Sequence, residues 1–320
     1  MFLETVRALK DEARASLEGM APPDEPGAPP DIDLGIGIRE PGDFRLAVRI
    51  RTLEPRPELQ AAILQRLTQV TDARDIDLQY TGRVFALPGD TEQADQLEQI
   101  VIGSSVSHYL TRGGTLGFFA FSLDNGDHGL VSANHVIGEL DAASEGDPIV
   151  HPWNGQPPDA TVATFVRSAK LGGGGNKHVD ASFAKLVTAD YDASALPGGK
   201  KLDPQIAAPE ESTSVFKFGA ATGLRAGTVL SFDWDKFQVR NYRNRFGVVQ
   251  FVDQIEIESA DRTYAFARKG DSGALVYNDR FRAVGLLFGM TLAGGKYDNG
   301  LFYANPMQFV LDELKVGLLT

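Results

Sequence analysis

The chain has 320 residues, no cysteine and a formal net charge of −12 at pH 7. This length suits one large or two modest domains, and the lack of cysteine excludes disulfides and thiolate-bound metals. The acidic balance argues against non-specific binding to nucleic acid or anionic membranes. No apolar run is long enough to span a bilayer, and residues 1–7 lack the apolar core of a secretory signal. We therefore expect a cytoplasmic protein with no nucleic-acid or membrane partner.

The first segment, residues 1–34, is predicted to be a helix followed by a proline-rich linker. Apolar residues recur at helical spacing between residues 2 and 20: Phe2, Val6, Leu9, Ala13, Leu17 and Met20. Such a helix docks on its own protein or on another subunit; a dedicated partner-binding helix is the alternative. Five prolines within 21–31 end the helix and favour an extended linker.

Residues 35–100 are predicted to form a small α/β domain. An alternating strand at 44–51 is followed by a helix at 57–67 that opens with a proline, and then by a strand near 76–87. Arg45, Arg49 and Arg51 alternate with apolar residues, so we expect them on one solvated strand face. A basic surface for a partner is the alternative. No catalytic constellation is evident in this unit.

Residues 101–320 change character and are predicted to be mainly β. Short β-rich runs alternate with Gly, Asp and Asn turns, at 115–123, 129–133, 160–171, 180–187, 214–220, 226–232, 248–257, 273–277 and 283–289. This cadence favours an all-β barrel or sandwich over β-α-β units. A short amphipathic helix is expected at 306–316.

A serine lies between glycines in the sequence Gly-Asp-Ser-Gly-Ala at 270–274, directly before an apolar run. The glycines allow a tight turn that directs backbone N–H groups inward. Ser272 is therefore a candidate nucleophile, and the N–H groups of Gly270 and Ser272 are a candidate oxyanion hole. A serine hydroxyl is a poor nucleophile alone, so a base and a group that orients it are required.

Two residues upstream are candidates for these roles. Of the five histidines, His135 ends an apolar strand, Leu-Val-Ser-Ala-Asn-His, at 130–135. Asp180 heads a second strand-like run, Val-Asp-Ala-Ser-Phe, at 179–183. The chain order is thus His135, Asp180, Ser272. His178 beside Asp180 suggests a metal pair, but no further ligands are spaced to complete it, so neither metal nor cofactor is expected.

These three motifs, in this order, resemble those of the chymotrypsin/trypsin-like serine proteases. His135, Asp180 and Ser272 fall on the family's histidine, aspartate and nucleophile, while Ala274 departs from its last glycine. The segments Gly-Thr-Leu-Gly at 114–117 and Lys-Phe-Gly-Ala-Ala-Thr-Gly at 217–223 are similar to the cysteine-free branch that includes the plant narrow-leaf protease and its bacterial relatives. The resemblance covers roughly residues 101–320.

The resemblance implies two antiparallel six-stranded barrels with the site at their junction. It implies a serine endopeptidase that works through an acyl-enzyme, with a protein or peptide as its substrate. It also assigns a substrate pocket to Phe266, Leu287, Phe288 and Gly289. Phe266 at the base of the pocket favours small or apolar substrate residues. Leu287 stands where digestive members of the family carry a serine that contacts the catalytic aspartate.

The resemblance also bears on regulation. Classical members of that family free a new N-terminal amine that pairs with the aspartate preceding the nucleophile, and here Asp271 must find another partner. We expect control by homo-oligomerisation or a regulatory protein rather than by zymogen cleavage. Two alternatives stay open: a catalytically degenerate module that binds proteins, and an effector whose site is assembled only when a partner binds.

Overall fold

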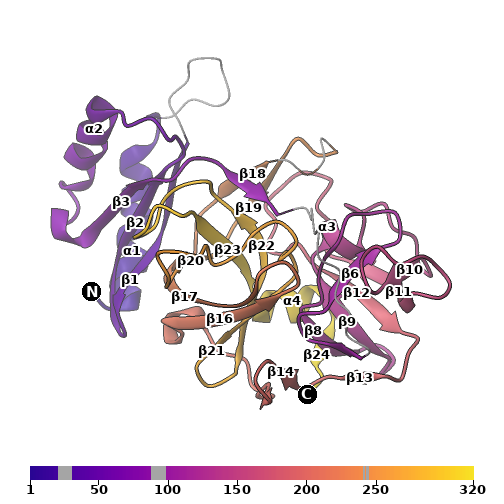
Figure 1. The fold of residues 1–320 in the computed structure, drawn as a ribbon. Coiled ribbons are helices and arrows are strands. Elements are labelled where there is room, and N and C mark those ends of the chain that lie inside the picture. Colours follow the sequence, from indigo (N-terminus) through magenta and orange to yellow (C-terminus); the bar gives the residue numbers. More distant parts are fainter. Residues whose placement is uncertain (21–30, 88–98, 241, 243–244) are drawn as a thin grey trace.

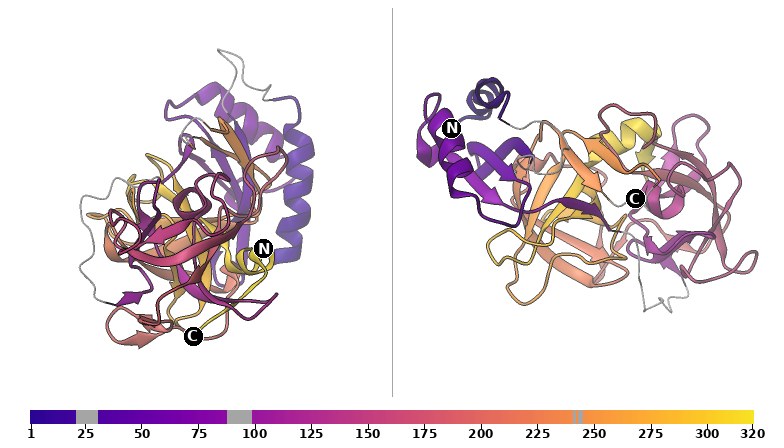
Figure 2. Two further views of the ribbon diagram at one scale, coloured as in Figure 1. Left: turned by 90° about the vertical axis from the view of Figure 1, so that its right-hand side faces the viewer. Right: turned by 90° about the horizontal axis from the view of Figure 1, so that it is seen from above.

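The computed structural model describes residues 1–20, 31–87, 99–240, 242 and 245–320. The predicted linker at 21–31 therefore lies almost wholly outside the described residues. Three bodies follow one another in space: an N-terminal α/β unit, a closed barrel in the middle and a second, open barrel (Figures 1 and 2). Among the described residues, no helix is long and apolar enough to cross a membrane.

The N-terminal unit is a three-stranded sheet with two helices. Its elements are α1 (Leu3–Leu17), β1 (Ile32–Glu40), β2 (Asp43–Ile50), α2 (Pro57–Leu67), the short 3-10 helix Ala73–Asp75 and β3 (Ile76–Tyr80). β1 and β2 are antiparallel, and β2 and β3 are parallel because α2 connects them. Leu46, Val48 and Ile50 of β2 pack with Leu9 of α1 and Ile63 of α2 in one buried cluster.

The other face of β2 corrects the expectation of a solvated basic face. Arg49 is fully buried, and Arg51 is only 5% exposed. Because side chains alternate across a strand, burying the apolar positions against the helices turns the arginines toward the middle barrel. There Arg49 meets Glu256 at 2.6 Å, and Arg51 meets Asp33. We call this buried polar cluster, Asp33, Arg49, Arg51, Glu256 and Tyr303, the seam.

The middle barrel is a closed ring of six antiparallel strands. They are β16 (Ser214–Gly219), β17 (Gly223–Phe232), β20 (Ile255–Ser259), β21 (Leu275–Asn278), β22 (Ala283–Met290) and β23 (Leu301–Pro306). β17 also pairs with β1, so the N-terminal sheet continues into this barrel. The hairpin β18 (Phe237–Arg240) and β19 (Val248–Phe251) and the short strand β4 (Val84–Ala86) extend the sheet beyond β22.

The other barrel is open rather than closed. Its strand order is β24-β8-β9-β12-β11-β10-β6-β7, and every pair is antiparallel. The bounds are β6 (Ser105–His108), β7 (Gly114–Thr115), β8 (Phe118–Ser122), β9 (His128–Ser132), β10 (Pro148–Val150), β11 (Thr161–Ser168), β12 (Ser182–Leu186) and β24 (Val316–Leu318). The helix α3 (Asn134–Ile137) follows β9, and short pairs β5–β13 (Ile100–Val101, Tyr191–Asp192) and β14–β15 (Ala195–Leu196, Lys200–Lys201) lie outside this sheet.

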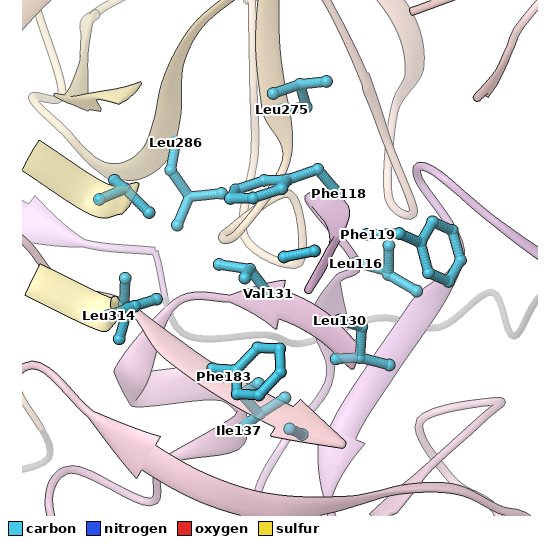
Figure 3. Close-up of a cluster of buried hydrophobic side chains, with 14 of the residues drawn as sticks. Leu116, Phe118, Phe119, Leu130, Val131, Ile137, Phe183, Leu275, Leu286 and Leu314 are labelled. Carbon is cyan, nitrogen blue, oxygen red and sulfur yellow. The ribbon is translucent and has the colours of Figure 1, made fainter. Parts of the chain in front are cut away.

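The predicted fold class is confirmed, with one correction: only one of the two barrels closes as a six-stranded ring. The barrels share an apolar core in which Leu275 and Leu286 of the middle barrel join Phe118 and Val131 of the open one (Figure 3). The helix α4 (Met307–Leu314) adds Leu314 to this core and leads into β24. The core fixes the junction at which the candidate residues meet.

Candidate active site

The structure brings the three predicted residues together at the junction of the barrels. His135 lies in α3 and Asp180 precedes β12, both on the open barrel, whereas Ser272 precedes β21 on the middle barrel. His135 Nδ1 lies 2.6 Å from Asp180 Oδ2, and His135 Nε2 lies 2.6 Å from Ser272 Oγ. All three are buried; the most exposed, His135, shows 4% of its surface.

Asp180 is held at both oxygens and at its backbone. Its Oδ1 accepts a hydrogen bond from the His135 backbone N–H at 3.2 Å, and its own N–H donates to Asn305 Oδ1 at 3.0 Å. With Oδ2 accepting from Nδ1, the imidazole presents an unprotonated Nε2 to the serine. This geometry lets His135 act as a base toward Ser272.

Tyr242 supplies a further contact that sequence reasoning missed. It follows β18, and its hydroxyl donates to Asp180 Oδ2 at 3.0 Å. Burial and the neighbouring carboxylate raise the pKa of Tyr242 well above its ordinary value, so the hydroxyl keeps its proton. Leu287 was expected to leave Asp180 without a hydroxyl contact, and Tyr242 provides one from another segment.

Asp271, the residue before the nucleophile, has its own buried partner. Lys217 Nζ lies 3.0 Å from Asp271 Oδ2, and neither side chain is exposed. The carboxylate also accepts from the backbone N–H groups of Ala221, Thr222 and Arg268 at 2.9–3.1 Å. Burial lowers the pKa of Lys217, while Asp271 acts in the opposite direction. Lys217 is thus the buried cation that pairs with Asp271.

The turn around Ser272 is fixed by its packing against the open barrel. Ser272 O accepts from the Thr115 N–H at 2.7 Å, and Gly270 O accepts from the Thr115 hydroxyl at 2.8 Å. A side chain at Gly273, whose φ is +86°, would come within 2.2 Å of Ser132 Oγ. The N–H groups of Asp271, Gly273 and Ala274 donate to backbone carbonyls. The oxyanion hole at Gly270 and Ser272 stays a prediction.

The predicted pocket residues divide into two sets. Phe266 is fully buried, with its ring centroid 5.7 Å from that of Phe302, and Leu287 bonds through its backbone to residues 273 and 274 inside the barrel. Phe288 and Gly289 instead face β4: the Leu87 N–H donates to Phe288 O at 3.1 Å, and Gly289 pairs with Ala86. The edge that could bind a peptide is therefore occupied by this chain's own strand.

His178 does not join Asp180. Its Nδ1 lies 3.0 Å from Asp253 Oδ2, whereas Asp180 faces His135. Among the described residues, no group of three or more His, Asp or Glu side chains could hold a metal ion.

No protein-family profile and no curated protein matches the chain. Bacterial serine proteases of the chymotrypsin/trypsin-like kind are among the solved structures that match. Thermobifida fusca protease A is 20% identical, with 69% of this chain and 98% of that chain covered and a TM-score of 0.47. A Nocardiopsis protease is 19% identical, covering 69% and 99%, with a TM-score of 0.46. A glutamic acid specific serine protease is 16% identical, covering 69% and 100%, with a TM-score of 0.48.

Proposed function

We propose that the protein is a serine endopeptidase with His135, Asp180 and Ser272 as its catalytic triad. The observation that carries the proposal is the continuous chain of contacts from Asp180 Oδ2 through the imidazole to Ser272 Oγ, at 2.6 Å for each link. A base between a carboxylate and a hydroxyl is the arrangement that activates a serine. The proposed setting is the cytoplasm, with a protein or peptide as substrate.

In the proposed mechanism, Ser272 Oγ attacks the carbonyl carbon of a peptide bond while its proton passes to His135 Nε2. Asp180 stabilises the imidazolium that forms, and the N–H groups of Gly270 and Ser272 stabilise the oxyanion. The C–N bond then breaks, and Nε2 returns the proton to the leaving amine. Water attacks the acyl-enzyme by the same route and releases the second product. No cofactor or metal takes part in these steps.

We also propose that maturation by cleavage is unnecessary. The supporting observation is the buried Lys217–Asp271 pair, which gives the residue before the nucleophile a cation from within the chain. Regulation then falls to a partner or to self-association. Activity that appears only after proteolysis near residue 110 would contradict this part of the proposal.

A non-catalytic binding module is the second candidate, because Ser272 has no exposed surface. A fluorophosphonate probe distinguishes the two. We expect slow labelling of the wild-type protein that is lost in both Ser272→Ala and His135→Ala variants. Failure to label both the folded wild type and a folded Leu87→Asp variant, which is expected to expose Ser272, would favour the binding module.

A further inference from the structure

A strand that the proposed mechanism does not use, β4, lies beside the triad. The chain leaves the N-terminal unit, passes over the middle barrel and ends as β4 beside β18 (Figure 1). β4 is antiparallel to β22, with Phe85 opposite Met290 and Ala86 opposite Gly289. An extended peptide that adds to a sheet edge makes this same ladder of main-chain hydrogen bonds. β4 thus lies where an acyl-side substrate strand would bind.

The residue after β4 reaches the nucleophile. Leu87 O lies 2.7 Å from Ser272 Oγ, and the Leu87 N–H donates to Phe288 O. Ser272 has one hydroxyl proton and two acceptors, Leu87 O and His135 Nε2. When the proton is donated to Leu87 O, the base cannot remove it. The carbonyl therefore competes with His135 at the atom on which the proposed chemistry depends.

The side chain of Leu87 is placed like a substrate side chain. It is fully buried and belongs to the same apolar cluster as Phe266 and Ala267, the residues that precede the nucleophile turn. A leucine side chain fits this lining because burying its apolar surface is favourable, whereas a charged side chain would be desolvated without a partner.

We propose that residues 84–87 are an internal pseudosubstrate, and that the site accepts extended peptides with a leucine-sized apolar residue before the scissile bond. This inference rests on the proposed function. Residue 88 is a proline, so the peptide bond after Leu87 carries no N–H. The proline ring also restricts the backbone conformation of the residue before it. The segment therefore pairs with β22 as a substrate strand would, while the bond that follows it is a poor one for cleavage.

Arg51 of the seam contacts the chain just before β4. Thr81, three residues before β4, accepts a hydrogen bond from Arg51 Nη1 at 3.0 Å, and the same nitrogen donates to the Tyr303 hydroxyl at 2.8 Å. Arg51 also pairs with Asp33 in β1. A movement of the N-terminal unit would therefore be transmitted toward β4 through the contact of Arg51 with Thr81.

The test is a Leu87→Asp variant, which places an unpaired charge in the apolar lining and should displace the segment. We expect fluorophosphonate labelling of Ser272 to become faster by about tenfold or more, since the accessible fraction of sites limits the apparent reactivity. Leu123→Asp is the matched control, because Leu123 is 63% exposed in the open barrel. Equal labelling rates in the wild type and Leu87→Asp would overturn the inference and leave the protease proposal intact. No labelling of either protein, both shown to be folded by circular dichroism, would overturn the protease proposal itself.

A peptide experiment does not depend on the folding of the variant. Mild urea treatment should activate the wild type by releasing residues 84–87 from β22. A synthetic peptide with the sequence of residues 83–87, Arg-Val-Phe-Ala-Leu, should then inhibit its cleavage of a reporter peptide. The same peptide ending in Asp should not. Reporter peptides with Leu before the scissile bond should be cleaved faster than those with Lys or Asp. Equal inhibition by the two peptides, or equal cleavage of the reporters, would reject the pseudosubstrate assignment.

Discussion

Asp180 at the barrel junction and Glu256 at the seam are both fully buried carboxylates, but their partners differ in charge. Asp180 accepts from the Tyr242 hydroxyl and a backbone N–H besides the imidazole, whereas Glu256 lies 2.6 Å from the Arg49 guanidinium. Neutral donors leave a carboxylate with its charge, which can then stabilise an imidazolium. A guanidinium cancels that charge. The arrangement at Asp180 suits the proposed catalysis, whereas the ion pair at Glu256 holds the N-terminal unit against the middle barrel.

The largest expected effect follows from removing the charge at the junction. Asp180→Asn should lower kcat/KM by about 10⁴-fold because an amide facing Nδ1 favours the wrong imidazole tautomer. The midpoint of urea unfolding should change little, since the substitution keeps the shape of the side chain. Asp159→Asn, at an exposed position, is the control. An activity loss below about tenfold would show that Asp180 does not orient the base.

A variant of Lys217 tests whether the buried ion pair beside the triad, Lys217–Asp271, also stabilises the fold. Lys217→Met should lower the free energy of unfolding by about 3–5 kcal/mol, because it leaves Asp271 charged, buried and without its cation. Urea unfolding followed by tryptophan fluorescence measures the change. The exposed Lys201→Met control should stay within about 0.5 kcal/mol of the wild type. A loss as small as that of the control would mean that backbone N–H groups alone suffice for Asp271.

Tyr242 tests the neutral donor at Asp180. Tyr242→Phe removes one hydrogen bond to a charged group, which contributes about 1.5–3 kcal/mol, so kcat/KM should fall by roughly 10- to 100-fold. Steady-state cleavage of a leucine-containing reporter peptide measures it. Tyr264→Phe, with 51% of the residue exposed, should retain full activity. Unchanged kcat/KM in the Tyr242 variant would show that the hydroxyl is dispensable.

The smallest effect is expected beside the seam, at Asp77. Burial acts to raise the pKa of Asp77, but Arg49 and Arg45 outweigh it and hold the pKa below its ordinary value of 3.8. Such a carboxylate adds stability that is present above the unfolded-state pKa and is lost as the pH falls through the folded-state pKa. Asp77→Asn should therefore be less stable than the wild type by about 1 kcal/mol at neutral pH. The difference should shrink below pH 3.8 in urea titrations; a constant difference would contradict the assignment.

The sequence predicted the fold class because strand cadence is a local property, and it singled out three residues that the structure places in contact. The burial of Lys217 was not predicted. Phe216 and Phe218 flank it in β16, and because side chains alternate across a strand, two apolar neighbours suggest that the lysine faces solvent. In the structure Lys217 shares the buried phase with Val215. The contact of Tyr242 with Asp180 was missed because no periodic pattern around Tyr242 indicates that it is buried. One strand near 76–87 was expected, whereas the structure has two, β3 and β4. The pairing of β4 with β22 joins segments that no local signal relates.

The segment from α4 to β24 has a mechanical consequence. α4 follows β23 of the middle barrel, Leu314 enters the shared core, and β24 pairs with β8 of the open barrel. Residues 307–318 thus link the two barrels. Force applied to this segment would load a pairing of only three residues, 316–318 with 120–122, and its loss would loosen the junction that holds His135 beside Ser272. In a single-molecule force experiment, activity should therefore vanish at a lower force than the unfolding of the closed barrel.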